Sequence, residues 1–176
     1  MLSPSSSAND NEHAFTYQIE VLFPNITEDK VRTVEFLDAA RGLVRIIEKL
    51  GKVFAPVKYD IQGNIDVIKS KLQSINYRAL HMILLFFEQI IEDSKTATPT
   101  EDLVAFLKKA YKEALQPYHG WMLLSLMVPT RSQLLQTITN EQTTEISIFI
   151  KSMEIYLMRL RENVLAIQLF YKTNNL

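Results

Sequence analysis

A long stretch without helix-breaking residues is the strongest constraint on the fold of this chain. Neither glycine nor proline occurs between Asn64 and Pro99, and apolar residues recur there at helical spacing. One helix could run through the whole stretch, but residues 73–76 have the weakest helical character, so we expect a break there. Residues 78–92 are apolar on nearly every side. That pattern predicts a central, buried helix.

Two further helices are expected before this central one. Residues 30–50 carry a broad apolar face, with Thr27 as the expected N-cap and Gly51 as the stop signal. Residues 53–59 read as a short connector whose turn is fixed by Pro56. A second helix is then expected to begin near Asp60.

The C-terminal half predicts four more helical segments. Thr98-Pro99-Thr100-Glu101 resembles a helix start, with an N-cap, a proline at N1 and a capping-box glutamate. A kink is expected at Pro117, followed by a short apolar helix over residues 121–128. A second capping box, Thr130 to Gln133, predicts a helix over residues 131–138, and an apolar stripe predicts a last one over residues 145–172. Met158 and the other methionines there are expected to fill the core.

These elements predict an all-α fold, with two packed layers of helices. Residues 1–14 are rich in Ser, Asn and Asp and have almost nothing to bury. We therefore expect a disordered tail over 1–14 and one domain over 15–176.

Composition excludes several classes of function. The net charge of −1 argues against a nucleic-acid partner, and the absence of cysteine excludes disulfides and zinc–thiolate sites. The sequence shows neither a secretory signal nor an apolar run long enough to span a bilayer. We expect a soluble, cytoplasmic monomer.

Nothing in the sequence resembles a catalytic or metal site. The three histidines lie far apart without partners at ligand spacing, and no nucleotide-binding or nucleophile motif occurs. Asp60 and His119 could form an acid–base pair if the fold joined them, but nothing local supports a nucleophile. We expect no enzyme activity and no cofactor.

A polar pair borders the apolar face of the second helix. Asp60 and Asn64 are four residues apart, so they share one side of a helix, and Lys71 points in nearly the same direction. Such an edge suits an amphiphilic ligand. A solvated helix shoulder would show the same pattern and is common.

Three stretches of the chain resemble the glycolipid transfer protein family, and they occur in that family's order. Residues 36–57 resemble its first long helix and the apolar connector that follows. Asp60-Ile61-Gln62-Gly63-Asn64 matches its D-x-x-G-N signature, and Lys109-Ala110-Tyr111 through Tyr118-His119-Gly120-Trp121 matches its K-A-Y and Y-H-G-W segment. The resemblance implies a two-layer all-α protein that carries a sphingolipid between membranes.

The resemblance also implies roles for individual residues. Asp60 would accept from the ceramide amide N–H, His119 would donate to the amide carbonyl, and Asn64 would bind the headgroup. Trp121 would contact the membrane or line the pocket. The acyl-chain tunnel would involve Ile47, Val53, Phe54, Val57, Met82, Phe86 and Leu115. The same residues would also suit an ordinary core.

The headgroup wall departs from the family pattern, and the segment before Arg78 is shorter. Ile75 occupies the place of the stacking tryptophan of glycolipid binders, or of an arginine in phosphate binders. Lys71 falls where phosphate binders carry a second arginine. Lys71 and Tyr77 could offer a substitute cation and ring, although neither matches a motif.

Several functions are therefore open. The first is binding and transfer of a glycosylceramide-type sphingolipid, with transient membrane contact. The alternatives are transfer or sensing of a ceramide-1-phosphate-type lipid, an abbreviated family member with impaired lipid binding, and a module that binds a partner helix.

Overall fold

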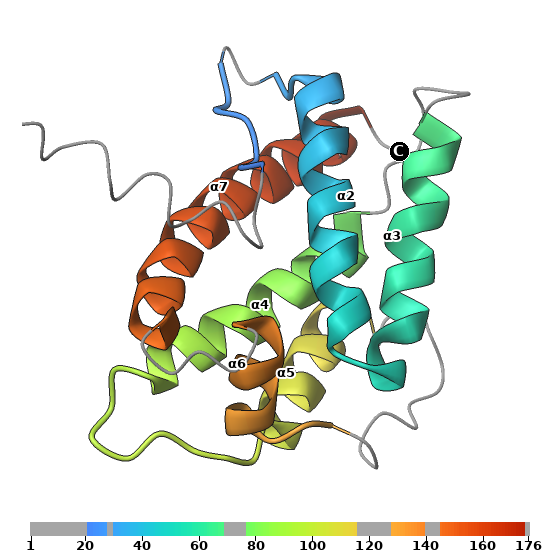
Figure 1. Cartoon of the computed structure of the whole chain (residues 1–176). Coiled ribbons are helices and arrows are strands. Elements are labelled where there is room, and N and C mark those ends of the chain that lie inside the picture. The colour runs from blue at the N-terminus through green and yellow to red at the C-terminus, as the bar shows by residue number, and fades with distance from the viewer. Residues whose placement is uncertain (1–20, 28–29, 69–76, 116–127, 140–144, 175–176) are drawn as a thin grey trace, which may run out of the picture.

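The computed structural model describes residues 21–27, 30–68, 77–115, 128–139 and 145–174 (Figure 1). Four sequence predictions fall outside these ranges: the tail over residues 1–14, the helix break at 73–76, the kink at Pro117 and the helix over 121–128.

The described residues form α-helices joined by short connections. No strand occurs within them beyond an isolated bridge between Thr27 and Lys30. The elements are α2 (Thr33–Lys49), the 3₁₀ helix η2 (Lys52–Phe54), α3 (Ala55–Ile68), α4 (Tyr77–Asp93), α5 (Val104–Ala114), α6 (Arg131–Ile138) and α7 (Glu145–Asn174). The all-α prediction is confirmed. Within the described ranges, no helix is long and apolar enough to cross a membrane.

The helices pack in two groups that meet at α4. Helix α2 packs against α3 and touches α6, whereas α5 and α7 both pack on α4. Contacts between α3 and α4 join the two groups. In Figure 1, α2 and α3 stand side by side and α4 crosses behind α2.

Helix α4 is central and buried, as its apolar circumference predicts. Its buried side chains point in several directions, so each helix that packs on α4 meets apolar residues. Phe86 contacts Phe54 of η2, with ring centroids 5.2 Å apart, and is fully buried. The buried residues of α4 are Ala79, Leu80, Met82, Ile83, Leu84, Phe86, Phe87, Ile90 and Ile91.

Helix α2 begins later than predicted. Its N-cap is Arg32, which makes no side-chain capping bond, and the proposed N-cap Thr27 instead accepts from the Lys30 N–H in a turn, 3.0 Å away. The Thr27 prediction is wrong because that residue closes a local turn ahead of the helix. Gly51 ends α2 as expected, with φ of 89°, a conformation that favours glycine.

The predicted connector over residues 53–59 is helical. The 3₁₀ helix η2 leads directly into α3, which begins at Ala55. Pro56 lies in the first turn of α3, where its missing N–H costs no helical hydrogen bond. Proline therefore starts this helix instead of fixing a turn before it.

The predicted start of α5 is also wrong. Residues 98–103 are not helical, and α5 begins at Val104, whose N–H donates to Asp102 Oδ1 at 2.9 Å. Glu101 does not cap its own helix. Its carboxylate accepts from the Ser132 N–H at 2.9 Å and the Ser132 hydroxyl at 2.7 Å, at the start of α6. A carboxylate is favourable at that helix end because it faces unpaired N–H groups.

The second capping box is confirmed. Thr130 Oγ1 accepts from the Gln133 N–H at 3.2 Å, and Gln133 Oε1 accepts from the Thr130 N–H at 3.0 Å. These bonds fix the first residue of α6 at Arg131.

Helix α7 follows its predicted stripe, and Leu157, Leu160 and Val164 are buried. Met158, expected in the core, is 49% exposed, because it lies on the side of α7 opposite the buried stripe. Polar Asn163 is fully buried, and its amide donates to the Pro24 carbonyl at 2.8 Å and the Arg159 carbonyl at 2.9 Å. Asn163 therefore anchors the segment before α2 on α7.

Replacing Asn163 by alanine should destabilise the protein by about 1–3 kcal/mol, because the buried Pro24 carbonyl loses its donor. Urea unfolding followed by circular dichroism measures the change. Asn174→Ala removes an exposed amide bond to Phe170 at the end of the same helix and should cost less than about 0.5 kcal/mol. Equal losses in the two variants would contradict an anchoring role.

His81 makes stability depend on pH. Burial lowers the pKa of His81, and Arg161 lowers it further, while Glu113 and Glu88 oppose the shift. The unfolded chain therefore binds a proton more readily than the folded one. The stability contributed by neutral His81 is complete above its ordinary pKa of 6.5 and is lost as the pH falls through the lowered value.

His81→Gln should therefore reduce the loss of melting temperature between about pH 7.5 and about pH 5.5. Thermal melts of both proteins at each pH measure the difference. An unchanged pH dependence in the variant would rule out His81 as its source.

Candidate functional site

The predicted polar pair lies on α3. Asp60 and Asn64 are one helical turn apart in this element, and the Asp60 side chain is half-buried. The neighbouring residues Val57, Ile61 and Ile65 are at most 3% exposed. The Asp60 carboxylate therefore lies at the border between solvent and an apolar interior.

Helix α3 is held against α2 by packing and by one ion pair. The Lys58 ammonium lies 2.8 Å from the Glu48 carboxylate of α2, and this hydrogen bond raises the pKa of Lys58. The ammonium also lies over the exposed Tyr59 ring, 5.4 Å from its centroid. These contacts fix the turn of α3 that precedes Asp60.

All the residues predicted to line an acyl-chain tunnel lie in one hydrophobic core. Their exposure runs from 0% to 8%. They come from four different elements and from the residue that follows α5. In chain order they are Ile47, Val53, Phe54, Val57, Met82, Phe86 and Leu115. The apolar interior beside Asp60 is thus the region that the resemblance identifies as a tunnel. An ordinary hydrophobic core would bury these residues to the same extent.

Other predicted site residues lie outside the described part of the chain. These are His119, Trp121, Lys71 and Ile75, together with the side chain of Asn64. Helix α5 is described up to Ala114 and its C-cap Leu115, four residues before His119. The joint geometry of Asp60 and His119 therefore stays a prediction.

Tyr77 is described and takes part in a tilted aromatic contact. Its ring lies 5.8 Å from the Tyr171 ring of α7, and the Arg78 guanidinium lies 5.8 Å from the centroid of Tyr77. Tyr77 thus begins α4 packed against the end of the last helix. The sequence offered no signal for this contact, because its two rings are far apart along the chain.

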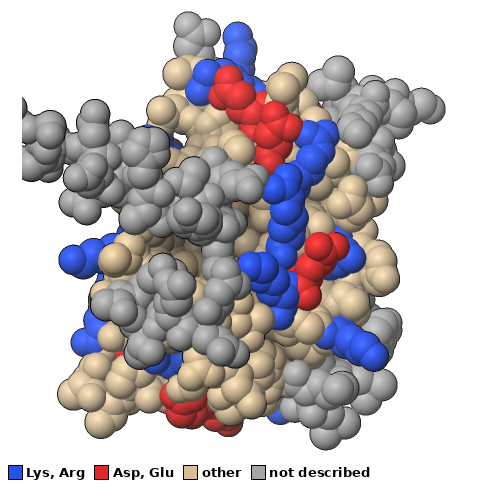
Figure 2. Space-filling view, viewed as in Figure 1, with Lys and Arg blue, Asp and Glu red and all other residues tan. Residues whose placement is uncertain are grey.

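The surface over this part of the molecule is of mixed charge. Figure 2 shows basic side chains along the face of α2, interrupted by acidic ones. Arg32 pairs with Glu35 at 2.8 Å, and Arg41 pairs with Asp38. Sequence reasoning missed the Lys58–Glu48 pair, since helical spacing does not relate residues on two helices.

Similarities to known proteins extend over most of the chain. The family model described as glycolipid transfer protein matches residues 31–77 and 76–140. Glycolipid transfer protein A of Xenopus laevis is 26% identical over 192 residues, covering 86% of this chain and 92% of the relative. Two solved structures have the same fold at low identity. The fungal glycolipid transfer protein HET-C2 has a TM-score of 0.72 at 20% identity, covering 90% of this chain and 96% of its own. The mouse ceramide-1-phosphate transfer protein has a TM-score of 0.68 at 18% identity, covering 93% of this chain and 96% of its own.

The packed helices and their buried apolar interior define an all-α protein with the fold of these two solved structures. The chain belongs to the glycolipid transfer protein family. Proteins of this family are lipid transfer proteins and not enzymes.

Proposed function

We propose that this protein binds a sphingolipid of the glycosylceramide type and carries it between membranes in the cytoplasm. The observation that carries the proposal is the position of Asp60. A half-buried carboxylate borders the residues that the family resemblance assigns to an acyl-chain tunnel. An amphiphilic lipid presents the complementary arrangement, with polar groups above two hydrocarbon chains.

The hydrocarbon chains supply most of the binding free energy. Each buried CH₂ contributes about 0.8 kcal/mol, so two long chains stabilise the complex far more than a few hydrogen bonds do. The tails must displace side chains that now fill the interior, such as Phe54 and Phe86. Binding therefore requires the two rings to separate, and tail burial offsets the lost packing.

The polar groups select the lipid. The Asp60 carboxylate accepts from the ceramide amide N–H, His119 donates to the amide carbonyl, and Asn64 binds the headgroup. Trp121 contacts the membrane interface during transfer, because an indole ring is favourable at that depth. The support for these roles is the match to the family motifs and the half-buried position of Asp60.

A phosphate headgroup is the second candidate. The family has ceramide-1-phosphate carriers, and the mouse protein of that name has the same fold as this chain. Phosphate binding needs cations, however, and Lys58, the lysine of α3 nearest to Asp60 in the sequence, is paired with Glu48 of α2. By resemblance, Lys71 falls where phosphate binders carry an arginine, whereas Asn64 favours the sugar type. An abbreviated carrier with impaired binding and a partner-helix module remain further alternatives.

Lipid selection distinguishes these candidates. Purified protein should carry a bound glycosylceramide through native mass spectrometry, and should transfer a fluorescent glycosylceramide between vesicles faster than ceramide-1-phosphate. We expect this order because the Asn64 amide of the proposed headgroup site favours a sugar, whereas a phosphate needs cations.

Faster transfer of ceramide-1-phosphate would favour the second candidate. Folded protein that neither binds nor transfers any sphingolipid would contradict both.

Asp60→Val should abolish transfer of the glycosylceramide, because the amide N–H loses its acceptor in a partly desolvated site. We expect the melting temperature to stay within about 4 °C of the wild-type value, since the side chain is only half-buried. Vesicle transfer assays and thermal melts measure the two effects.

Asp38→Val is the matched control. Asp38 is an exposed carboxylate on α2 that pairs with Arg41, so its loss should leave transfer unchanged. A large drop in melting temperature for Asp60→Val would show that the carboxylate supports the fold instead.

A further inference from the structure

Helix α7 exposes a second apolar face, opposite the one that it buries. Its inner residues Met153, Leu160 and Val164 are at most 1% exposed. On the outer side lie large apolar side chains that are each about half exposed, between 48% and 57%. These are Ile148, Ile155, Met158, Leu165, Leu169 and Phe170.

The spacing of these exposed residues is that of a helix–helix seam. All of them except Phe170 fall on the a and d positions of one heptad frame that begins at Ile148. Lys151, Glu162 and Lys172 occupy the other a and d positions of this frame, and all three are exposed. We call this set the outer stripe. A two-in-seven stripe is the pattern that packs against a partner helix.

The charges within the outer stripe specify the partner. In a parallel pair of α7 helices, Lys151 would face Lys151 and Glu162 would face Glu162 of the second copy. In an antiparallel pair centred between Tyr156 and Leu157, Lys151 faces Glu162 of the second copy twice, by symmetry. Like charges repel in the first arrangement and opposite charges attract in the second.

The same antiparallel register pairs the apolar residues with one another. Ile148 then faces Leu165 of the second copy, and Ile155 faces its Met158. A shift by one heptad would place Lys151 against Leu169 and Glu162 against Met158. Only the first register matches both the apolar and the charged positions.

The surroundings of the outer stripe fit such an interface. Within the described part of the chain, Lys151 has no ion pair, and Glu162 approaches only Arg159, at 3.7 Å. Both groups are therefore available to a second copy.

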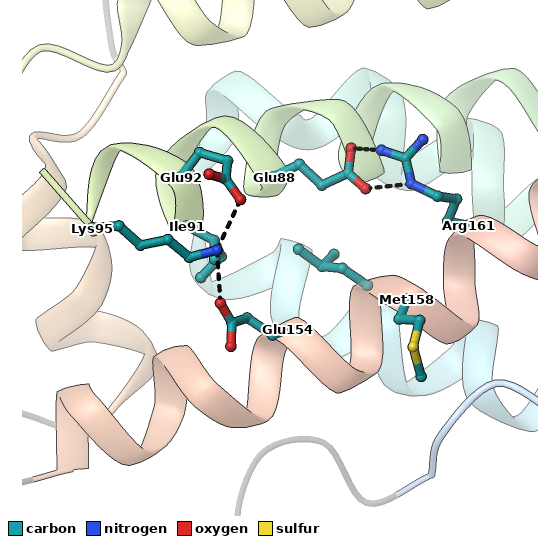
Figure 3. A pocket seen from close by; sticks show the side chains of 8 residues that line it. Glu88, Ile91, Glu92, Lys95, Glu154, Met158 and Arg161 are labelled. Atoms are coloured by element: carbon teal, nitrogen blue, oxygen red, sulfur yellow. Dashed lines mark hydrogen bonds and ion pairs between the residues drawn. The ribbon is translucent and has the colours of Figure 1, made fainter.

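A groove of about 380 Å³ lies between α4 and α7, beside Met158 (Figure 3). Its apolar lining includes Ile91 and Leu157. The Arg161–Glu88 pair borders it, and so does Lys95, which lies 2.8 Å from Glu92 and 3.0 Å from Glu154. An apolar centre with a charged rim is the usual composition of a protein interface.

We propose that two copies of this chain associate through the outer stripe as an antiparallel α7 pair. This differs from the monomer expected from the sequence, because periodicity alone does not tell which face of α7 the fold leaves exposed. Asp60 is on α3, which packs against α2, whereas α7 packs against α4. Dimer formation can therefore be tested independently of lipid transfer.

Charge reversal tests the register. The full chain should form a dimer with a dissociation constant in the micromolar range. Analytical ultracentrifugation at protein concentrations from about 1 to about 100 µM measures that constant. Lys151→Glu and Glu162→Lys should each raise the dissociation constant at least about tenfold, because each places like charges together twice. The double variant K151E/E162K restores opposite charges and should return the constant to within about threefold of the wild-type value.

Lys172→Glu is the matched control. It makes the same charge change in the same outer stripe, but the position facing Lys172 precedes Glu145, the first residue of α7. Its dissociation constant should therefore stay within about twofold of the wild-type value. Circular dichroism establishes that every variant is folded.

Three results would overturn the proposal. The first is a protein that remains monomeric at about 100 µM. Coverage of the outer stripe by residues 1–20 of the same chain would give this result. The second is a dimer that Lys151→Glu leaves intact. The third is a failure of the double variant to recover the dimer that both single variants lose.

Discussion

The apolar circumference of α4 is the constraint on which the rest of the structure depends. A helix with nine buried residues over four turns has to be covered on every side, so α5, α7 and the η2–α3 region all pack against it. Two carboxylates of α4 form ion pairs beside the groove that α4 makes with α7, Glu88 with Arg161 and Glu92 with Lys95. The burial of α4 thus decides both the two-group architecture and the place of its ion pairs.

The same interior has to satisfy two demands if it receives lipid tails. A folded protein without ligand needs a packed core, and Phe54 against Phe86 provides part of it. A bound tail needs that volume for itself. The affinity for a lipid is then the free energy of burying the tail, less the free energy of separating side chains that pack well together. Asp60 can act as a selective group only because it lies at the border of this interior. A carboxylate deeper inside would cost more free energy to desolvate.

Sequence periodicity predicted the long helices well and their starts less well. Helices α4 and α7 lie within two residues of their predicted ends, because each buries a long apolar face whose spacing is visible in the sequence. The starts near Thr27 and Glu101 were wrong. Both have the composition of a cap, but Thr27 closes a turn and Glu101 bonds to Ser132, far away in the chain. A capping motif shows which side chains can accept a hydrogen bond. It does not show which donor the tertiary structure will bring close to them.

The candidate site was predictable to a similar extent. Helical spacing predicted that Asp60 and Asn64 lie on one helix, and both positions are in α3, while their shared role in a site stays a prediction. The burial of the expected tunnel residues followed from their apolar character. The Lys58–Glu48 pair and the Tyr77–Tyr171 contact were not predictable, because each joins two helices whose relative position is a property of the whole fold.

The two apolar faces of α7 show a further limit of sequence periodicity, which does not tell a buried apolar face from an exposed one. The inner face is broad, and its pattern predicts core residues. The outer stripe is narrower, so its residues are easily assigned to the core, as Met158 was in the sequence prediction. Single exposed apolar residues are ordinary on protein surfaces, but several aligned along one helix are not. With a net charge of only −1, long-range repulsion does little to keep such faces apart. What orders their association is then local: one lysine and one glutamate, placed in the stripe so that only an antiparallel partner pairs both.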